Sequence, residues 1–147
     1  MFVGTHIVGV DAKGRCSIPA AFRAALQGAE TVYLWPSYKA PCLEGGDLAL
    51  LERYQAAMAR LETGQDDFEY AIFGEARALE CDATGRVSLP EALRAHAGLN
   101  SQAAFTGLSD RFEIWSPEAL EARVAAARAR ASEAQALLRR KPPEAGG

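Results

Sequence analysis

The hydrophobic and polar positions of this chain follow one pattern twice. Residues 11–23 contain a polar turn, then alternating polar and apolar positions, then a proline and a short apolar helix face. The same order returns in residues 82–94, and each position there is numbered 71 higher than its counterpart (82 − 11 = 71). Eight of the thirteen positions are identical. Chance does not plausibly give such an ungapped match, so we expect two copies of one small unit.

The local pattern predicts that each copy is a strand, a tight turn, a second strand and a short helix. The turn begins with Asp, which can accept backbone N–H groups, and ends with Gly, which adopts positive φ easily. Beyond the turn, the period of two places Arg15 and Arg86 on a polar strand face. Pro19 and Pro90 follow and suit the first turn of a helix.

A single copy of about forty residues cannot bury a sufficient core by itself. Two copies in one chain can cover each other's apolar faces. The predicted fold class is therefore α+β, with the two copies related by an intrachain pseudo-two-fold axis.

The remaining β-rich segments extend both copies. High β-branched and aromatic content predicts strands at residues 31–35, 103–107 and 111–115. A short strand is also expected at residues 41–44, where Gly45 and Gly46 are interpreted as loop.

Three further segments have helical patterns. Asp47 is expected to cap a helix whose apolar stripe comprises Leu50, Tyr54, Met58 and Leu61. A shorter helix is expected to begin at Asp66 or Asp67. A third helix should start at residues 116–118 and run to about residue 139.

Charge is distributed unevenly along the chain. The net charge of −3 argues against a general polyanion binder. Residues 1–28, however, contain three basic residues and one acidic residue, whereas residues 44–80 contain three basic and nine acidic residues. Positive charge is therefore expected near the turn and helix of the repeat.

The sequence contains no catalytic or metal-binding pattern. It lacks a Gly-x-Ser-x-Gly elbow, a phosphate-binding Gly-x-x-x-x-Gly-Lys loop and a His-Glu-x-x-His motif. Cys16, Cys42 and Cys81 lack metal-ligand spacing and are interpreted as reduced core residues. Asp11 and Asp82 are better explained as turn caps than as paired catalytic acids. We therefore predict no enzyme, no metal and no cofactor.

The chain also lacks features that would direct it to a membrane. It contains no run of about eighteen apolar residues. The first residues have no basic start followed by an apolar core, as a signal peptide would. A cytoplasmic location is therefore expected.

The signature Asp-x-Lys-Gly-Arg-x-x-Ile-Pro in residues 11–19 resembles the AbrB-like swapped-hairpin DNA-binding unit. Two such units in a chain of 147 residues resemble the MraZ family of bacterial transcriptional regulators. Residues 1–4 and 110–118 fit that family as well, and the resemblance covers about residues 1–120. It implies a double-split β-barrel with added helices between the repeats and at the C-terminus.

The expected organisation follows from the repeat and the resemblance together. Repeat 1 is assigned to residues 5–48, a helical insert to 47–75, repeat 2 to 76–119, a C-terminal helix to 117–140 and a disordered tail to 141–147. The helical insert is expected to cover the barrel or to contact a neighbouring subunit. The basic C-terminal stretch has three open interpretations: a solvated helix, a docking arm for another subunit, or an auxiliary phosphate contact.

The favoured hypothesis is sequence-specific binding of double-stranded DNA. Arg15 and Arg86 are expected to enter the major groove and donate to guanine O6 and N7. Lys13, Arg23 and Arg94 are expected nearer the backbone, where their contacts depend on salt. Thr84 replaces Lys13 in the second copy, which predicts that the first copy binds more strongly.

The resemblance also implies partners and a biological role. It implies a ring-like homo-oligomer, associated with the nucleoid, that binds direct repeats in a promoter. It further implies a repressor of the division and cell-wall gene cluster, including its own gene. The alternative is an AbrB-like antitoxin or protein-interaction module without specific promoter binding.

Overall fold

The computed structural model of the chain describes residues 1–140. They belong to two compact units, of which the first is Met1–Pro117 and the second begins at Glu118. Helix α5 (Pro117–Arg139) starts at the last residue of the first unit and supplies the described part of the second. Its bounds agree with the helix that was predicted to start at residues 116–118 and to run to about residue 139. The predicted disordered tail at 141–147 lies outside the described residues. Across residues 1–140, no helix combines the length and the apolar character needed to cross a membrane.

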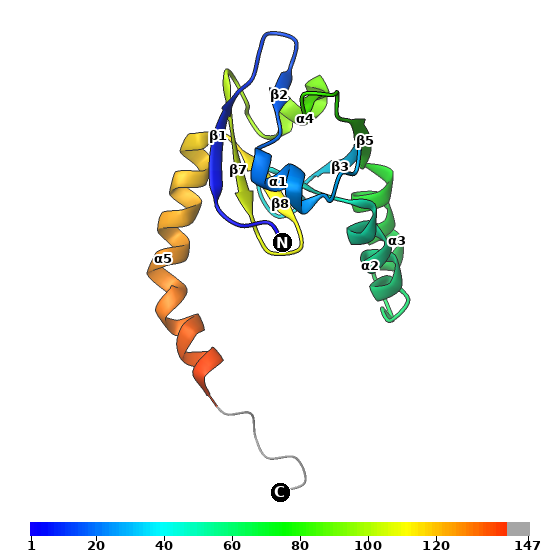
Figure 1. Ribbon diagram of the computed structural model, residues 1–147. Helices are drawn as coiled ribbons and strands as arrows, with labels where there is room; N and C mark the ends of the chain where they lie inside the picture. The colour runs from blue at the N-terminus through cyan, green and yellow to red at the C-terminus, as the bar shows by residue number, and fades with distance from the viewer. Residues whose placement is uncertain (141–147) are drawn as a thin grey trace, which may run out of the picture. The chain divides into compact units, whose positions relative to one another are not determined.

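The first unit contains eight strands, four α-helices and one π-helix, which confirms the α+β class (Figure 1). The first copy supplies β1 (Thr5–Gly9), β2 (Arg15–Ser17), α1 (Ala20–Ala25), β3 (Thr31–Pro36) and β4 (Leu43–Gly46). The second supplies β5 (Arg77–Glu80), β6 (Arg86–Ser88), α4 (Glu91–His96), β7 (Gln102–Gly107) and β8 (Phe112–Trp115). The insert between them contains α2 (Leu48–Met58), α3 (Gln65–Phe68) and the π-helix η1 (Glu69–Gly74).

The pairing of the strands shows the two-fold relation between the copies. Six strands form an antiparallel sheet in the order β1-β7-β8-β4-β3-β5, and β2 pairs with β6 in a separate two-stranded ribbon. Exchanging each strand for its counterpart in the other copy reverses this order and leaves it otherwise unchanged. The register agrees: Gly9 pairs with Gln102, and their counterparts Glu80 and Thr31 pair with each other.

The α+β class expected from the double-split β-barrel resemblance is confirmed, but the sheet is not closed into a barrel. In the first unit, β1 and β5 form opposite edges of the open six-stranded sheet. The ladder does not continue from β1 into β2 or from β5 into β6, because β2 and β6 pair with each other across the two copies. The exchanged hairpin strands therefore form a ribbon of their own instead of closing the sheet.

Strand β4 begins two residues later than predicted and includes Gly45 and Gly46. Both positions face close neighbours: a Cβ on Gly45 would lie 2.9 Å from the ring of Phe112, and one on Gly46 would lie 2.6 Å from Leu50. Gly45 therefore allows close packing within the sheet and Gly46 allows close packing against α2, and the interpretation of these two residues as loop was wrong.

The core is assembled from the inward faces of both copies. Phe22 of α1 lies at its centre and is fully buried. Its ring centroid lies 5.5 Å from that of Phe2, 5.5 Å from that of Phe112 and 6.2 Å from that of Phe105. The predicted inward positions of the hairpin strands and the residues that follow them are also buried: Cys16, Ile18, Val87 and Leu89.

A second apolar cluster joins the insert to the first copy, because Leu50 of α2 and Ile72 of η1 belong to the same cluster as Trp35 of β3. Asp47 caps α2 as predicted, because its Oδ1 accepts the backbone N–H of Leu50 at 3.0 Å. Leu61 does not continue the buried stripe, since α2 ends at Met58 and the Leu61 side chain is 45% exposed.

The start of α3 and of the two repeat helices also differs from the prediction. Gly64, with φ of +82°, is the N-cap of α3, and the acids predicted to cap this helix lie in its first turn. Pro19 and Pro90 occupy the N-cap positions of α1 and α4. They therefore stand one residue before the helical turn that the sequence pattern suggested.

Replacing Phe22 with Ala is expected to lower the free energy of unfolding by about 3–5 kcal/mol, because the ring at the centre of the core shared by the two copies is lost. Urea denaturation followed by circular dichroism measures this change. Tyr70→Ala, at a side chain that is 76% exposed, is the control and should change stability by no more than about 0.5 kcal/mol. Equal losses in the two variants would contradict the assignment of Phe22 to the core.

Candidate nucleic-acid interface

The two turns are held by the same set of hydrogen bonds. Asp11 Oδ1 accepts the backbone N–H of Lys13 at 2.9 Å and that of Arg15 at 2.8 Å. Asp82 Oδ1 accepts the two equivalent N–H groups of the second copy, both at 2.9 Å. The glycine that ends each turn has φ of +84° in the first copy and +81° in the second. These contacts confirm the predicted turn caps and fix the residue that follows each turn.

The hydrogen bonds also keep both carboxylates ionised. The backbone N–H of Arg15 is the main cause of the lowered pKa of Asp11, and the Arg15 side chain adds to it. The backbone N–H of Arg86 and then the Thr84 hydroxyl lower the pKa of Asp82. A pair of acids that shares a catalytic proton needs one raised pKa. The lowered pKa values therefore agree with turn capping.

Each turn aspartate also orients the arginine that follows it. Arg15 Nε donates to Asp11 Oδ2 at 2.7 Å, and Arg86 Nε donates to Asp82 Oδ2 at 3.1 Å. The arginine side chains are 45% and 49% exposed, so solvent screens these ion pairs and they add little to stability. Their main effect is to fix the direction of the guanidinium groups. Within residues 1–140, the terminal Nη groups of both arginines have no hydrogen-bond partner.

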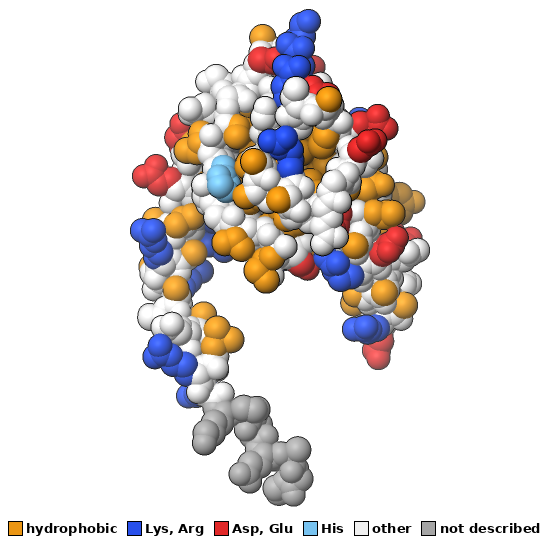
Figure 2. Space-filling model, viewed as in Figure 1, with side chains coloured by type: hydrophobic (Ala, Val, Ile, Leu, Met, Phe, Trp, Pro, Cys, Tyr) orange, Lys and Arg blue, Asp and Glu red, His pale blue; other side chains and the backbone are white. Residues whose placement is uncertain are grey.

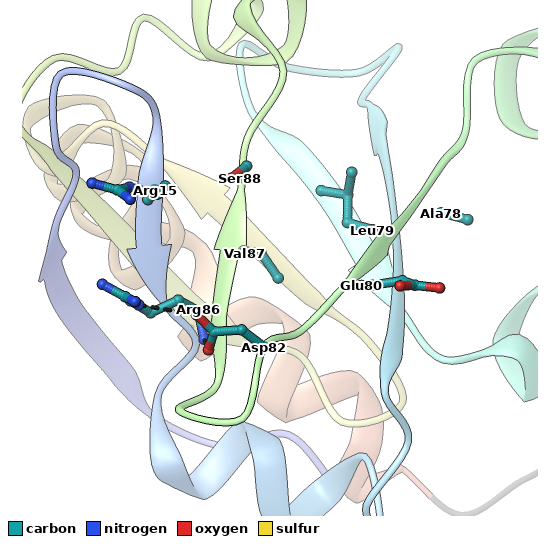
Figure 3. A pocket seen from close by; sticks show the side chains of 8 residues that line it. All are labelled: Arg15, Ala78, Leu79, Glu80, Asp82, Arg86, Val87 and Ser88. Atoms are coloured by element: carbon teal, nitrogen blue, oxygen red, sulfur yellow. Dashed lines mark hydrogen bonds and ion pairs between the residues drawn. The ribbon is translucent and has the colours of Figure 1, made fainter.

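The ribbon brings the two arginines onto one face. Arg15 pairs with Ser88 and Arg86 pairs with Ser17, so the two arginines are diagonal neighbours across the ribbon. The Cα atoms of diagonal neighbours in an antiparallel pair lie about 7–8 Å apart. Both side chains extend to the same side of the ribbon, and Val87 points to the other side (Figure 3). Neither guanidinium is buried, so both can belong to one shared surface.

The surface is hollowed on both sides of the arginines. One cavity, of about 260 Å³, is lined by both arginines with Glu80 and Asp82, and another, of about 350 Å³, is lined by both arginines with Asp11. The two cavities are counterparts under the two-fold relation of the copies. Lys and Arg side chains, together with Asp and Glu, gather at the end of the unit where the β1–β2 hairpin lies (Figure 2).

The structure places the other three predicted site residues differently from one another. Lys13 is exposed in its turn, next to Arg15. Arg23 of α1 and Arg94 of α4 each lie against the turn of the opposite copy, over a glycine. From the sequence, these two arginines were expected near the phosphate backbone, and this contact between the copies was not predicted.

Two further contacts of this surface were not predicted from the sequence: those of the turn aspartates with the arginine side chains, and that of the Thr84 hydroxyl with Asp82. The Asp-x-x-x-Arg spacing, which occurs once in each copy, was a signal that each aspartate orients its arginine. Thr84, which replaces Lys13, donates its hydroxyl to Asp82 Oδ1 at 2.7 Å, so it strengthens the second turn and adds no charge.

Two of the cysteines are buried thiols. Burial raises the pKa of Cys16 to about 11 and that of Cys42 to about 12. They are therefore protonated at neutral pH and poor nucleophiles. In the described part of the chain, no group of three His, Cys, Asp or Glu residues could hold a metal ion.

The lowered pKa values predict a pH dependence of stability. Because the folded-state pKa of each turn aspartate lies below the ordinary value of 3.8, ionisation stabilises the fold above that pH. This contribution is lost as the pH falls through the folded-state pKa. The difference in free energy of unfolding between the wild type and the Asp11→Asn/Asp82→Asn variant should therefore shrink from about pH 6 to about pH 2. Urea titrations across this range measure it, and a constant difference would contradict the proposed role of the carboxylates.

Comparison with known proteins shows the family to which the chain belongs. A sequence model of the family described as "MraZ protein, putative antitoxin-like" matches residues 1–67 and 72–140. A protein of Gluconobacter oxydans named "Transcriptional regulator MraZ" is 42% identical over 139 residues, which cover 89% of this chain and 85% of the relative. Proteins with the same name from Gluconacetobacter diazotrophicus and Xanthobacter autotrophicus are 41% and 39% identical, over 88% and 90% of this chain and 87% of each relative. These relatives are named as regulators of transcription and not as enzymes, in agreement with the predicted absence of catalysis. The chain belongs to the MraZ family.

Proposed function

We propose that this chain regulates transcription by binding DNA sequence-specifically through the β2–β6 ribbon. The observation that carries the proposal is the pair of half-exposed guanidinium groups on one ribbon face, each oriented by an aspartate. The names of the relatives, all transcriptional regulators, support the same class of function.

The ribbon suits the major groove of B-DNA. That groove is about 12 Å wide and admits a two-stranded β-ribbon, which an isolated pair of strands such as β2–β6 provides. Since each Nε is bonded to an aspartate, the Nη groups of Arg15 and Arg86 are the donors that remain for guanine O6 and N7. Ser17 and Ser88 are exposed on the same face and extend its polar surface.

Contacts to the phosphate backbone would supply the salt-dependent part of the affinity. Lys13 is exposed beside Arg15 and is the best-placed lysine for such a contact. The second copy has Thr84 at this position, so we propose that the first copy contributes more electrostatic affinity. The predicted phosphate contacts of Arg23 and Arg94 stay a prediction.

The wider role rests on the family resemblance. We propose that copies of this chain assemble into a ring-like homo-oligomer and bind direct repeats in the promoter of the division and cell-wall gene cluster, including its own gene. In this proposal it acts there as a cytoplasmic, nucleoid-associated repressor. Repeated sites suit a small reading surface, because each further subunit binds at a high effective concentration.

One observation favours a second candidate function. The family description includes the words "antitoxin-like", so an AbrB-like module that neutralises a protein partner is the alternative. Co-purification of a stoichiometric partner from the native host, without retention of promoter DNA, would favour that function over promoter binding.

Arg15→Ala and Arg86→Ala are each expected to weaken binding to the region upstream of the protein's own gene by roughly tenfold to a hundredfold, through loss of a guanine contact. Arg60→Ala is the matched control, because it removes the same charge from an exposed position of the insert. Footprinting and titration at two salt concentrations measure the affinities, with random DNA as the reference.

A specific footprint that is lost in the two variants and kept in the control would support the proposal. Wild-type promoter affinity in folded Arg15→Ala and Arg86→Ala proteins would refute base reading by the ribbon.

A further inference from the structure

The glycines that end the two turns are buried although their neighbours are exposed. Gly14 lies between Lys13 and Arg15, both of which are exposed, and Gly85 lies between two exposed residues in the same way. A turn glycine at a surface is normally accessible, so something must cover each of these two positions.

The covering group is an arginine from the other copy. A Cβ on Gly14 would lie 2.7 Å from Nε and 2.9 Å from Cζ of Arg94, and 2.7 Å from the carbonyl oxygen of Leu89, both of which belong to the second copy. A Cβ on Gly85 would lie 2.6 Å from Nη1 and 2.7 Å from Nε of Arg23, which belongs to the first copy. Each arginine side chain therefore lies in the space in which any other residue would have its Cβ, and at Gly14 the Leu89 carbonyl shares that space.

Hydrogen bonds connect each of these two arginines to Arg15 or Arg86, the arginines proposed to contact bases and called the reading arginines below. Arg23 Nη1 donates to the backbone carbonyl of Thr84 at 3.4 Å, a long bond inside the second turn. The same turn is tied to Asp82, which holds Arg86. Arg23 of the first copy thus lies in contact with the turn that positions Arg86 of the second.

Arg94 of the second copy contacts the turn of the first copy in a related way. Arg94 Nε donates to the carbonyl of Leu89 at 3.1 Å, and the Leu89 N–H donates to the carbonyl of Gly14 at 2.8 Å. Gly14 N–H closes the first turn on the carbonyl of Asp11, whose side chain orients Arg15. Arg94 of the second copy is therefore connected to the turn that positions Arg15 of the first.

We propose that Arg23 and Arg94 are positioning residues that hold the turn of the opposite copy, so that Arg23 sets the direction of Arg86 and Arg94 sets that of Arg15. This inference rests on the proposed reading role of Arg15 and Arg86. The direction of each reading arginine would then depend on an arginine of the other copy, in addition to the pairing of β2 with β6.

The shape of the side chain distinguishes positioning from a phosphate contact. A planar guanidinium fits flat over a glycine and bonds a carbonyl in a fixed direction, whereas a lysine ammonium is a compact charge on a flexible stem. A phosphate contact tolerates that exchange far better, because it needs mainly positive charge.

The test is a pair of double-mutant cycles on promoter affinity in the full chain. One cycle combines Arg23→Ala with Arg86→Ala, and the matched cycle combines Arg23→Ala with Arg15→Ala. We expect Arg23→Ala to weaken binding about tenfold in the wild type and hardly at all once Arg86 is absent, while its effect in the Arg15→Ala background stays about tenfold. Arg23→Lys should fail to restore affinity, and the salt dependence of binding should be unchanged.

A second measurement requires no DNA. Gly85→Ala should shift the urea midpoint less in an Arg23→Ala background than in the wild type, because the crossing guanidinium is gone. Gly64→Ala is the control: its φ is also positive, at +82°, but no atom lies within 4 Å of the added Cβ, so its shift should be the same in both backgrounds.

The outcomes separate this inference from the proposed function. Equal effects of Arg23→Ala in both DNA cycles, rescue by Arg23→Lys and a reduced salt dependence would assign Arg23 to a phosphate contact and overturn the inference. Independence of the Gly85→Ala shift from Arg23 would also overturn it. If Arg15→Ala and Arg86→Ala themselves leave affinity unchanged, the proposed function fails, and the stability measurement still decides whether the crossing contact holds the turn.

Discussion

The structure depends on the exchange of one short strand between two copies of the same unit. Strands β2 and β6 contain three residues each, too few for an isolated hairpin to be stable, and each finds its partner in the other copy. The exchange continues past the strands, because Ile18 N–H donates to the carbonyl of Gly85 and Leu89 N–H donates to that of Gly14. Buried side chains from both copies meet behind this ribbon in one core. Neither copy has a complete core or a complete ribbon without the other.

This constraint gives the reading surface its rigidity. The aspartate of each turn uses one carboxylate oxygen to fix the backbone and the other to fix the arginine side chain. Little conformational entropy is then left for the guanidinium groups to lose when they bind a base, which favours affinity. The chain can remain acidic overall, because its proposed DNA contacts lie on one small surface and not on a generally basic one.

The sequence was sufficient for the features that depend on local periodicity and turn chemistry. The internal repeat identified both turns, the buried positions beyond them and the exposed placement of Arg15 and Arg86, because these follow from a period of two and from the demands of a tight turn. It did not show that Gly45 and Gly46 lie within a strand, since their role depends on Leu50 and Phe112 from other elements. The contacts of Arg23 and Arg94 were missed for the same reason: each partner is in the other copy, at a distance of about sixty to eighty residues along the chain. The open sheet also depends on pairing between copies, which residue patterns do not specify.

The central claim is that the ribbon reads guanine in the major groove, and replacement of single guanines by 7-deazaguanine in the promoter site tests it most directly. This replacement removes the N7 acceptor and leaves base pairing and the phosphates intact. The account predicts that a few specific positions lose affinity on replacement, and that the loss at one of them disappears in the Arg15→Ala protein because its contact is already absent. Full affinity for DNA in which every guanine of the site is replaced would contradict the account.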